Sequence, residues 1–266
     1  MLAFFTFFRD IFKNRFLLFQ LVHRDVFSQY KNSRLGIFWA FAEPLAFMGV
    51  LYLVFGIGLR GGRDMSIPFI CYLVSGMSVV NLFSAGLTKS VRTVKSHSFL
   101  LKKVNFRLSL LPFSTVISEV INHFLFFIAV IIILFVNQQF PNWYWFQLFY
   151  YLIAVIAFMV GLSFFVSAIG VFVNDLASVI SIFTRVLFYF TPVFWDYEML
   201  PETIQKYVRL NPLFYIATGY RDSLFYNIPF WEKPGLTLYY WCWVLFFLIL
   251  GVFTFRKLSP QFADYI

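Results

Sequence analysis

The chain has 266 residues, of which 61% are hydrophobic, 23% aromatic and only 12% charged, with a formal net charge of +9. Soluble domains carry about 25% charged residues, so this composition excludes a soluble globular protein. The long uncharged runs lack the alternation of a barrel strand and approach the about 20 apolar residues that a spanning helix needs. The sequence therefore predicts an all-α integral membrane protein.

The N-terminal segment 1–35 precedes the first of these runs. Residues 1–28 are apolar but are interrupted by Arg9, Asp10 and four further charged residues. Such a segment lies in the membrane interface as an amphipathic helix and does not cross the bilayer. It is not typical of a signal peptide, because charges interrupt the apolar run and no small-residue cleavage site follows.

Six apolar runs follow and define one transmembrane domain over residues 36–266. The predicted helices are 36–59, 67–88, 109–136, 145–173, 177–195 and 236–255. The fourth run is long enough to tilt or to project beyond the bilayer. The fifth contains Arg185 and ends at Thr191-Pro192.

Lys and Arg residues fall mostly on one side of the predicted barrier. Six lie in 1–35, six lie in the connection 89–107, and three more are Arg185, Arg256 and Lys257. The opposite side has only six, and acidic residues offset them. Because cytoplasmic segments are enriched in positive residues, both termini are predicted to be cytoplasmic. The net charge then reflects topology and attraction to anionic lipid, and not nucleic-acid binding.

The connection 89–107 carries a modest apolar stripe among its cations, which predicts a short helix on the cytoplasmic surface. Two interpretations are open: the cations anchor the segment to phospholipid, or a cytoplasmic partner binds the helix. In the second, apolar anchors dominate the interface and exposed charges at its rim contribute little. The candidate residues for this contact are Arg92, Lys95, His97, Phe99 and Leu100.

The connection 196–235 is too apolar and aromatic for a free loop. It contains two helical stretches, one beginning at Leu200-Pro201 and one following Asn211-Pro212. Two interpretations are open here also: a pair of short re-entrant helices in the outer leaflet, or a folded cap without a transport role. Irregular backbone at membrane depth survives only when it is buried in protein or faces a water-filled path.

Three charges lie inside predicted spanning helices, namely Glu43, Glu119 and Arg185. Counted from the predicted cytoplasmic ends, they lie at about 10, 15 and 12 Å depth. An unpaired charge at such a depth costs at least about 2.5–3.5 kcal/mol. We therefore expect Arg185 to pair with Glu119 or Glu43 inside the bundle. These groups are too few for a proton relay.

The sequence shows no catalytic group and no metal-ligand spacing. It contains no GxxxxGK[ST] stretch for a nucleotide phosphate and no defensible Ser/His/Asp arrangement. Cys71 and Cys242 are predicted near the outer ends of two helices, as buried small hydrophobes or as a disulfide.

Several short motifs, taken in order, resemble the ABC-2 type permeases that export polysaccharides. The N-terminal motif residues are Arg24, Asp25, Tyr30, Gly36 and Trp39, followed by Glu43-Pro44 and Val54-Phe55-Gly56. Later segments that fit are 101–106, Leu110-Leu111-Pro112, Asn211-Pro212 and 255–260. Glu43-Pro44 is similar to capsule exporters, whereas 55–62 is similar to the teichoic-acid branch, so the polymer stays open between capsule, O-antigen and teichoic acid.

The resemblance implies a homodimer of six-helix permeases in the bacterial cytoplasmic (inner) membrane, bound to two copies of a separate ABC ATPase. ATP and Mg²⁺ would bind that partner and not this chain, and the cargo would be a lipid-linked polysaccharide. It also implies an interface helix, a coupling helix between helices two and three, and outer re-entrant helices. Aromatic faces accept the C–H faces of sugar rings, or else form an interfacial belt. The candidate path aromatics are Trp195, Tyr197, Phe214, Tyr215 and Tyr220.

Three alternatives belong to other functional classes. An ABC-2 permease for a small lipophilic compound would lack a continuous, sugar-sized aromatic path. An energy-independent lipid scramblase would need no ATPase. A membrane-embedded enzyme would need a polar catalytic cluster at the membrane surface, and the sequence shows none.

Overall fold

A computed structural model describes residues 14–28, 33–59, 66–101 and 106–265. Within these ranges the chain is helical and contains no strand, as predicted. The main helices are α2 (Arg15–Ser28), α3 (Trp39–Leu51), α4 (Phe69–Ser96), α5 (Ser98–Leu101), α6 (Leu110–Val136), α7 (Gln147–Phe172), α8 (Leu176–Phe190), α9 (Glu202–Arg209), α10 (Pro212–Arg221), α11 (Pro234–Leu258) and α12 (Phe262–Tyr265). Shorter 3₁₀ or π turns are η1 (Gly36–Phe38), η2 (Tyr52–Gly58), η3 (Trp143–Phe146), η4 (Tyr197–Met199), η5 (Asp222–Tyr226), η6 (Phe230–Glu232) and η7 (Ser259–Gln261).

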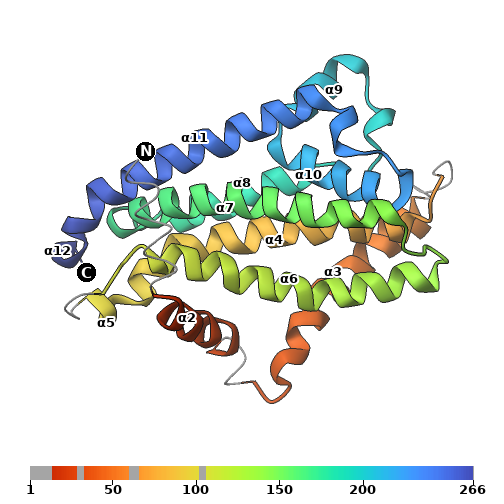
Figure 1. The fold of residues 1–266 in the computed structure, drawn as a ribbon. Helices are drawn as coiled ribbons and strands as arrows, with labels where there is room; N and C mark the ends of the chain where they lie inside the picture. Colours follow the sequence, from red (N-terminus) through yellow and green to blue (C-terminus); the bar gives the residue numbers. More distant parts are fainter. Residues whose placement is uncertain (1–13, 29–32, 60–65, 102–105, 266) are drawn as a thin grey trace.

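The long helices run side by side (Figure 1), with α5 and α12 at one end of the bundle and α9 at the other. Five stretches of the described chain are long and apolar enough to cross a membrane: Trp39–Gly58, Phe69–Ser96, Leu110–Val136, Trp143–Phe172 and Pro234–Tyr265. They confirm five of the six predicted spans in outline.

The fifth predicted span, 177–195, is shorter than expected. Its helix, α8, has 15 residues, because Thr191-Pro192 ends it after Phe190. At 1.5 Å per residue it is about 22 Å long, whereas a hydrocarbon core is about 30 Å thick. The structure therefore shows an apolar helix at this place but not a full-length span.

The second predicted helix is longer than expected, since α4 continues from residue 88 to Ser96. Its extra turns form because Leu87, Val91 and Val94 keep one buried apolar stripe at helical spacing. The cationic part of the 89–107 connection therefore belongs to α4. Among the described residues of this connection, the one separate helix is α5, which has four residues.

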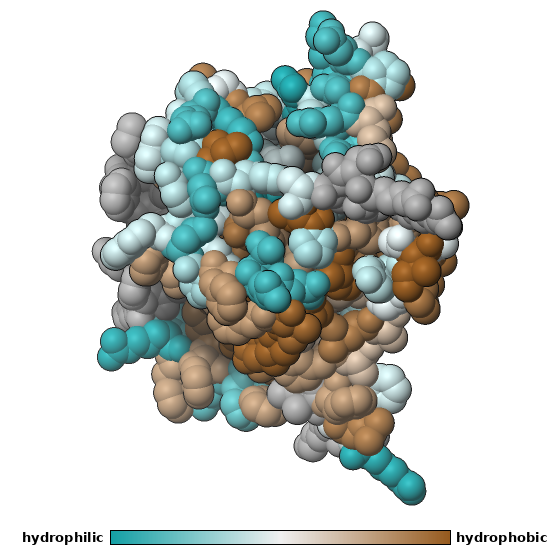
Figure 2. Space-filling model, turned by 90° about the vertical axis from the view of Figure 1, so that its right-hand side faces the viewer, coloured by the Kyte–Doolittle hydropathy of each residue, from teal (hydrophilic) through white to brown (hydrophobic). Residues whose placement is uncertain are grey.

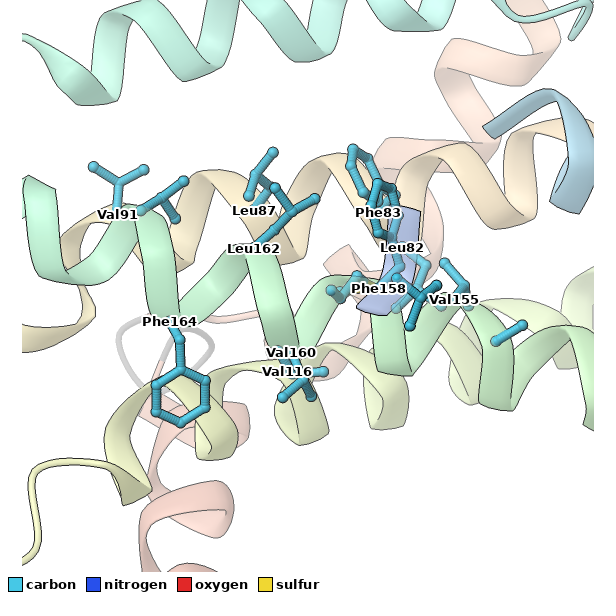
Figure 3. Close-up of a cluster of buried hydrophobic side chains, with 14 of the residues drawn as sticks. Leu82, Phe83, Leu87, Val91, Val116, Val155, Phe158, Val160, Leu162 and Phe164 are labelled. Atoms are coloured by element: carbon cyan, nitrogen blue, oxygen red, sulfur yellow. The ribbon is translucent and has the colours of Figure 1, made fainter. Parts of the chain in front are cut away.

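The core lies where α4, α6, α7 and α11 meet (Figure 3). The rings of Phe83 in α4 and Phe158 in α7 pack with centroids 5.6 Å apart. Glycines allow close backbone approach: a Cβ on Gly170 of α7 would lie 2.3 Å from the Val91 carbonyl oxygen of α4. Small residues at such contacts are a general device of membrane helix packing.

The N-terminal segment contains a helix, as predicted, and α2 packs against α6 through Leu21, Val22 and Val26. Its other side exposes Phe16 and Phe19, which suits contact with lipid. Residues 1–13, part of the predicted interface segment, lie outside the described residues.

The α9 end of the bundle contains two short helices, as the 196–235 segment predicts. Pro212 begins α10, and the Asn211 side chain accepts a hydrogen bond from the Leu213 backbone N–H. The helix is buried against α4 and α7. Figure 2 views this end of the molecule and shows hydrophilic surface around an apolar patch.

Candidate functional site

A buried carboxylate, Glu119 of α6, forms an ion pair that the sequence did not predict. Lys89 Nζ of α4 lies 2.5 Å from Glu119 Oε1, and Asn122 Nδ2 donates to the same oxygen at 3.2 Å. Glu119 is 5% exposed, so its charge needs these partners. The sequence places Lys89 in the connection 89–107, because the predicted spanning helix ends one residue before it.

The expected pairing of Arg185 with Glu119 or Glu43 is wrong within one chain. No ion pair among the described residues includes Arg185 or Glu43. Both side chains are exposed in the single chain, and Glu43 lines an open cavity between α3, α4 and α6. Charges at a similar predicted depth in the membrane form a pair only if their helices are also rotated so that the two side chains face each other.

The Lys89–Glu119 pair lies at the junction of two cavities. The α8 cavity, of about 610 Å³, is lined by residues of α2, α4, α6 and α8, most of which are polar, together with Ala177 and Ile182. The α3 cavity, of about 710 Å³, is lined by α3, α4 and α6, and includes Trp39 and Glu43. Lys89 and Glu119 contribute to both walls.

One face of α4 connects the two cavities. Its polar cavity-lining residues are mostly three or four positions apart, as residues on one side of a helix are: Ser78, Asn81, Ser84, Thr88, Lys89, Arg92, Thr93 and Ser96. From the first to the last they extend over about 27 Å of helix, close to the thickness of a hydrocarbon core. Polar groups in a membrane helix face the bundle interior or a water-filled cavity, so this stripe is the best candidate for a transport path.

The structure separates the predicted coupling residues into exposed and buried ones. Phe99 is 51% exposed, with the Arg24 guanidinium carbon 5.1 Å from its ring centroid. Leu100 is buried at 7% exposure and belongs to the core, so its predicted role as an external anchor is wrong. The α4 extension turns Leu100 inward and leaves Phe99 as the anchor candidate.

His97 is buried between the end of α4 and α2, so it is not available on the surface for contact with a partner. It is 5% exposed, and its Nε2 lies 3.2 Å from Asp25 Oδ1 of α2. Its Nδ1 lies 2.8 Å from the Thr93 carbonyl oxygen. The pair therefore ties the interface helix to the end of α4. Of the predicted rim residues, Arg92 faces the α8 cavity and Lys95 donates to Asn174 Oδ1 at 2.7 Å.

Two other residues of the N-terminal motif, Gly36 and Trp39, lie in the turn before α3 and at its start. Gly36 has φ of +53°, a conformation that glycine adopts without steric cost. Trp39, the first residue of α3, is 47% exposed and lines the α3 cavity. Tyr30 lies outside the described residues.

The five predicted path aromatics do not form one ring. Tyr215 and Tyr220 are only 3% and 1% exposed and pack in the core, so their predicted place at the exit is wrong. The inward face of α10 buries them against α7. Tyr197 and Phe214 instead lie together, with ring centroids 5.0 Å apart. Trp195 Nε1 donates to the Tyr189 carbonyl oxygen at 3.2 Å.

The two cysteines do not form the disulfide that the sequence left open. Cys71 is buried and Cys242 is exposed, and both are free.

Comparison with known proteins identifies the class to which this bundle belongs. The model of the ABC-2 type transporter family matches residues 17–225, and the chain belongs to this family. The match begins within α2 and continues past the end of α10, so it includes most of the residues that line both cavities and the predicted coupling segment.

Relatives of known role are similar over nearly their whole length. The O-antigen export system permease protein RfbA of Klebsiella pneumoniae is 30% identical over 257 residues, which is 93% of this chain and 94% of that protein. A protein of the same name from Myxococcus xanthus is 26% identical over 82% of this chain and 84% of its own length. The polysialic acid transport protein KpsM of Escherichia coli is 24% identical over 88% of this chain and 90% of its own length.

Proposed function

We propose that this chain is the permease subunit of an ATP-driven ABC exporter that moves a lipid-linked polysaccharide across the bacterial inner membrane. The observation that carries this proposal is the end-to-end similarity to O-antigen and polysialic acid permeases. The polar face of α4 supports it, because a hydrophilic polymer needs a hydrophilic wall through the apolar region. The polymer itself stays open between O-antigen, capsule and teichoic acid.

The active assembly is a homodimer with two copies of an ABC ATPase, which binds ATP and Mg²⁺. Two features support a second copy. In the α3 span only 11% of the most apolar stretch is buried, and α8 exposes Val179, Ile182 and Val186. The outward charges of Glu43 and Arg185 also lack ion-pair partners among the described residues. A symmetric partner packed on α3 and α8 covers both features and closes the polar face into a conduit.

Six crossings with both termini in the cytoplasm make up the proposed topology, in which α8, followed by α9 and α10, is the fifth crossing and α11 is the sixth. The charge asymmetry of the sequence supports it. Single cysteines at Asn137 or Gln205 should react with a membrane-impermeant thiol reagent in intact cells, and one at Ser96 should not. Labelling at Ser96 from outside contradicts this orientation.

Coupling to the ATPase takes place at the α4–α5 junction. Phe99 is exposed there, and the His97–Asp25 pair transmits movement of the junction to α2. Phe99→Ala should reduce polysaccharide export several-fold per inserted molecule while the protein level stays unchanged. Phe146→Ala is the matched control, because that ring is also exposed, at 65%, but belongs to the opposite end of the bundle. Normal export by Phe99→Ala removes this contact from the proposal.

The function is tested by export in a bacterium that lacks its own O-antigen permease and carries this chain with its ATPase. We expect surface polysaccharide only when both subunits are present and the ATPase hydrolyses ATP. Export without ATP hydrolysis indicates a scramblase. Efflux of small lipophilic compounds without any surface glycan indicates an ABC-2 permease for a small lipophilic compound. Either result overturns the proposal.

A further inference from the structure

A third cavity lies at the α9 end of the bundle, away from the α4 polar face and the coupling segment. This α9 cavity has a volume of about 640 Å³, within the range of about 300–1,000 Å³ typical of small-ligand sites. Its walls come from α4, the segment around η4, α9, α10 and η5. Neither the family match nor the transport path described above assigns a role to it.

Arg221 is the most informative residue of its wall. Its side chain is 3% exposed, and its guanidinium carbon lies 3.4 Å from the centroid of the Tyr72 ring. One terminal nitrogen donates to the carbonyl oxygens of Tyr72 and Val193, each at 3.2 Å. Its Nε has no hydrogen-bond partner among the described residues. Because a buried charge with an unused donor is costly, a polar group bound in the cavity would stabilise this wall.

The charges around the cavity are balanced in sign. Its cationic residues are Arg209, Arg221 and Lys233, and its acidic residues are Asp196, Glu198 and Asp222. Lys233 pairs with Asp222, and Arg209 Nε donates to the Tyr197 hydroxyl. A site for a phosphate or a polyanion would present an excess of cations. Balanced donors and acceptors instead suit a neutral ligand whose hydroxyls both donate and accept hydrogen bonds.

Aromatic rings complete this chemistry. Tyr72 and Phe214 lie in the floor at 5% and 4% exposure, whereas Tyr226 is 42% exposed at the edge. An apolar ring face packs against the C–H face of a sugar ring, and neighbouring charged groups bind its hydroxyls.

We propose that the α9 cavity binds a neutral segment of the exported glycan, of a few sugar residues, on the outer side of the membrane. This inference rests on the proposed function for its ligand and its orientation. In this role the cavity holds the emerging polymer between transport steps, and Asp196 and Tyr226 at its edge contact the sugar.

The test measures binding by the permease in nanodiscs, without the ATPase. The probe is carrier-free polysaccharide of the producing bacterium, released by mild acid, with inorganic pyrophosphate as the anionic comparison. Asp196→Ala and Tyr226→Ala should each weaken polysaccharide binding about tenfold, the loss expected for one hydrogen bond to a charged group or one ring contact. Both residues lie at the edge of the cavity, so these variants avoid the buried Arg221.

Glu202→Ala is the matched control, because Glu202 is an exposed acid of α9 that does not line the cavity. Unchanged polysaccharide binding in both edge variants, no binding by the wild-type protein, or stronger binding of pyrophosphate than of polysaccharide overturns the inference. Export measured in parallel separates the two proposals. If the wild-type protein exports polysaccharide but does not bind it at this cavity, the proposed glycan site is wrong and the proposed function stands. If the cavity binds the glycan but the protein does not export it, the proposed function is wrong and the binding site stands.

Discussion

The α3 span and α4 are both apolar enough to cross a membrane, yet they have opposite environments in the fold. In α4, 78% of the most apolar stretch is buried, whereas in the α3 span only 11% is. Both stretches contain glycines, but α4 also contains Ser and Thr residues, which the α3 span lacks. Gly76 and Gly86 of α4 lie in close contact with neighbouring segments, and Ser163 Oγ of α7 donates a hydrogen bond to Ser90 Oγ of α4. The α3 span exposes Val50 and Leu53 at equivalent depth in its helix.

Hydropathy therefore identifies a span but does not say whether protein or lipid surrounds it. In lipid, helix association depends on close packing and interhelical hydrogen bonds, since lipid tails are as apolar as leucine. On this basis α4 and α7 form the scaffold, and α3 and α8 form the surface left for assembly. Four pairs of substitutions test the division, from the largest expected effect to the smallest.

The sharpest contrast is between two glycines. A Cβ on Gly251 of α11 would lie 2.1 Å from the Gly161 carbonyl oxygen of α7, whereas one on Gly49 of α3 meets nothing within 4 Å. Gly251→Ala should destabilise the protein by about 3 kcal/mol or more, because backbone cannot move aside as a side chain does. Gly49→Ala should leave the yield of monodisperse protein in size-exclusion chromatography unchanged. Equal yields of the two variants would break the comparison.

A second contrast concerns side-chain removal. Phe158 of α7 is 4% exposed and Leu53 of η2 is 59% exposed. Phe158→Ala should cost about 3–5 kcal/mol through the cavity that it leaves against Phe83. Leu53→Ala should stay within about 0.5 kcal/mol. Thermal unfolding in detergent, followed by loss of the chromatographic peak, measures both, and a similar shift for the two variants contradicts the assigned environments.

The Lys89–Glu119 pair tests the polar part of the scaffold. Lys89→Met leaves Glu119 buried without its cation and should cost about 1–3 kcal/mol, less than a fully buried pair because Lys89 is 45% exposed. Lys89→Met with Glu119→Gln should recover part of this loss. The measurement is a double-mutant cycle on thermal unfolding. Additive losses would show that the two groups do not interact.

The smallest effect on stability is expected for the outward charges. Glu43→Gln and Arg185→Met should each change the stability of the purified chain by no more than about 0.5 kcal/mol, since both are exposed. Export should nevertheless fall if α3 and α8 meet a second copy. A large loss of stability in either variant would place these residues in the scaffold, contrary to the comparison.

The extent of prediction from sequence differs between features of the molecule. Five spans, the N-terminal helix, the two short helices near the α9 end and the family were all predicted, because each depends on local composition, a Pro or Asn signal, or an ordered set of motifs. The length of α4 was not, because a helix continues through charged residues when its other face stays buried. The apolar stripe formed by Leu87, Val91 and Val94 is the feature of the sequence that indicates this continuation of α4.

The partners of individual side chains were decided by tertiary structure alone. Glu119 was recognisable as a costly intramembrane charge, but its pairing with Lys89 depends on how α4 and α6 are rotated against each other. The same holds for Tyr215 and Tyr220, which helical rotation buries, and for Leu100, which turns away from the surface. Sequence thus determined which segments enter the membrane, since that depends on the solvation of each segment by itself. Only packing decided which face of each helix is covered, because that depends on the shape and hydrogen bonds of its neighbours.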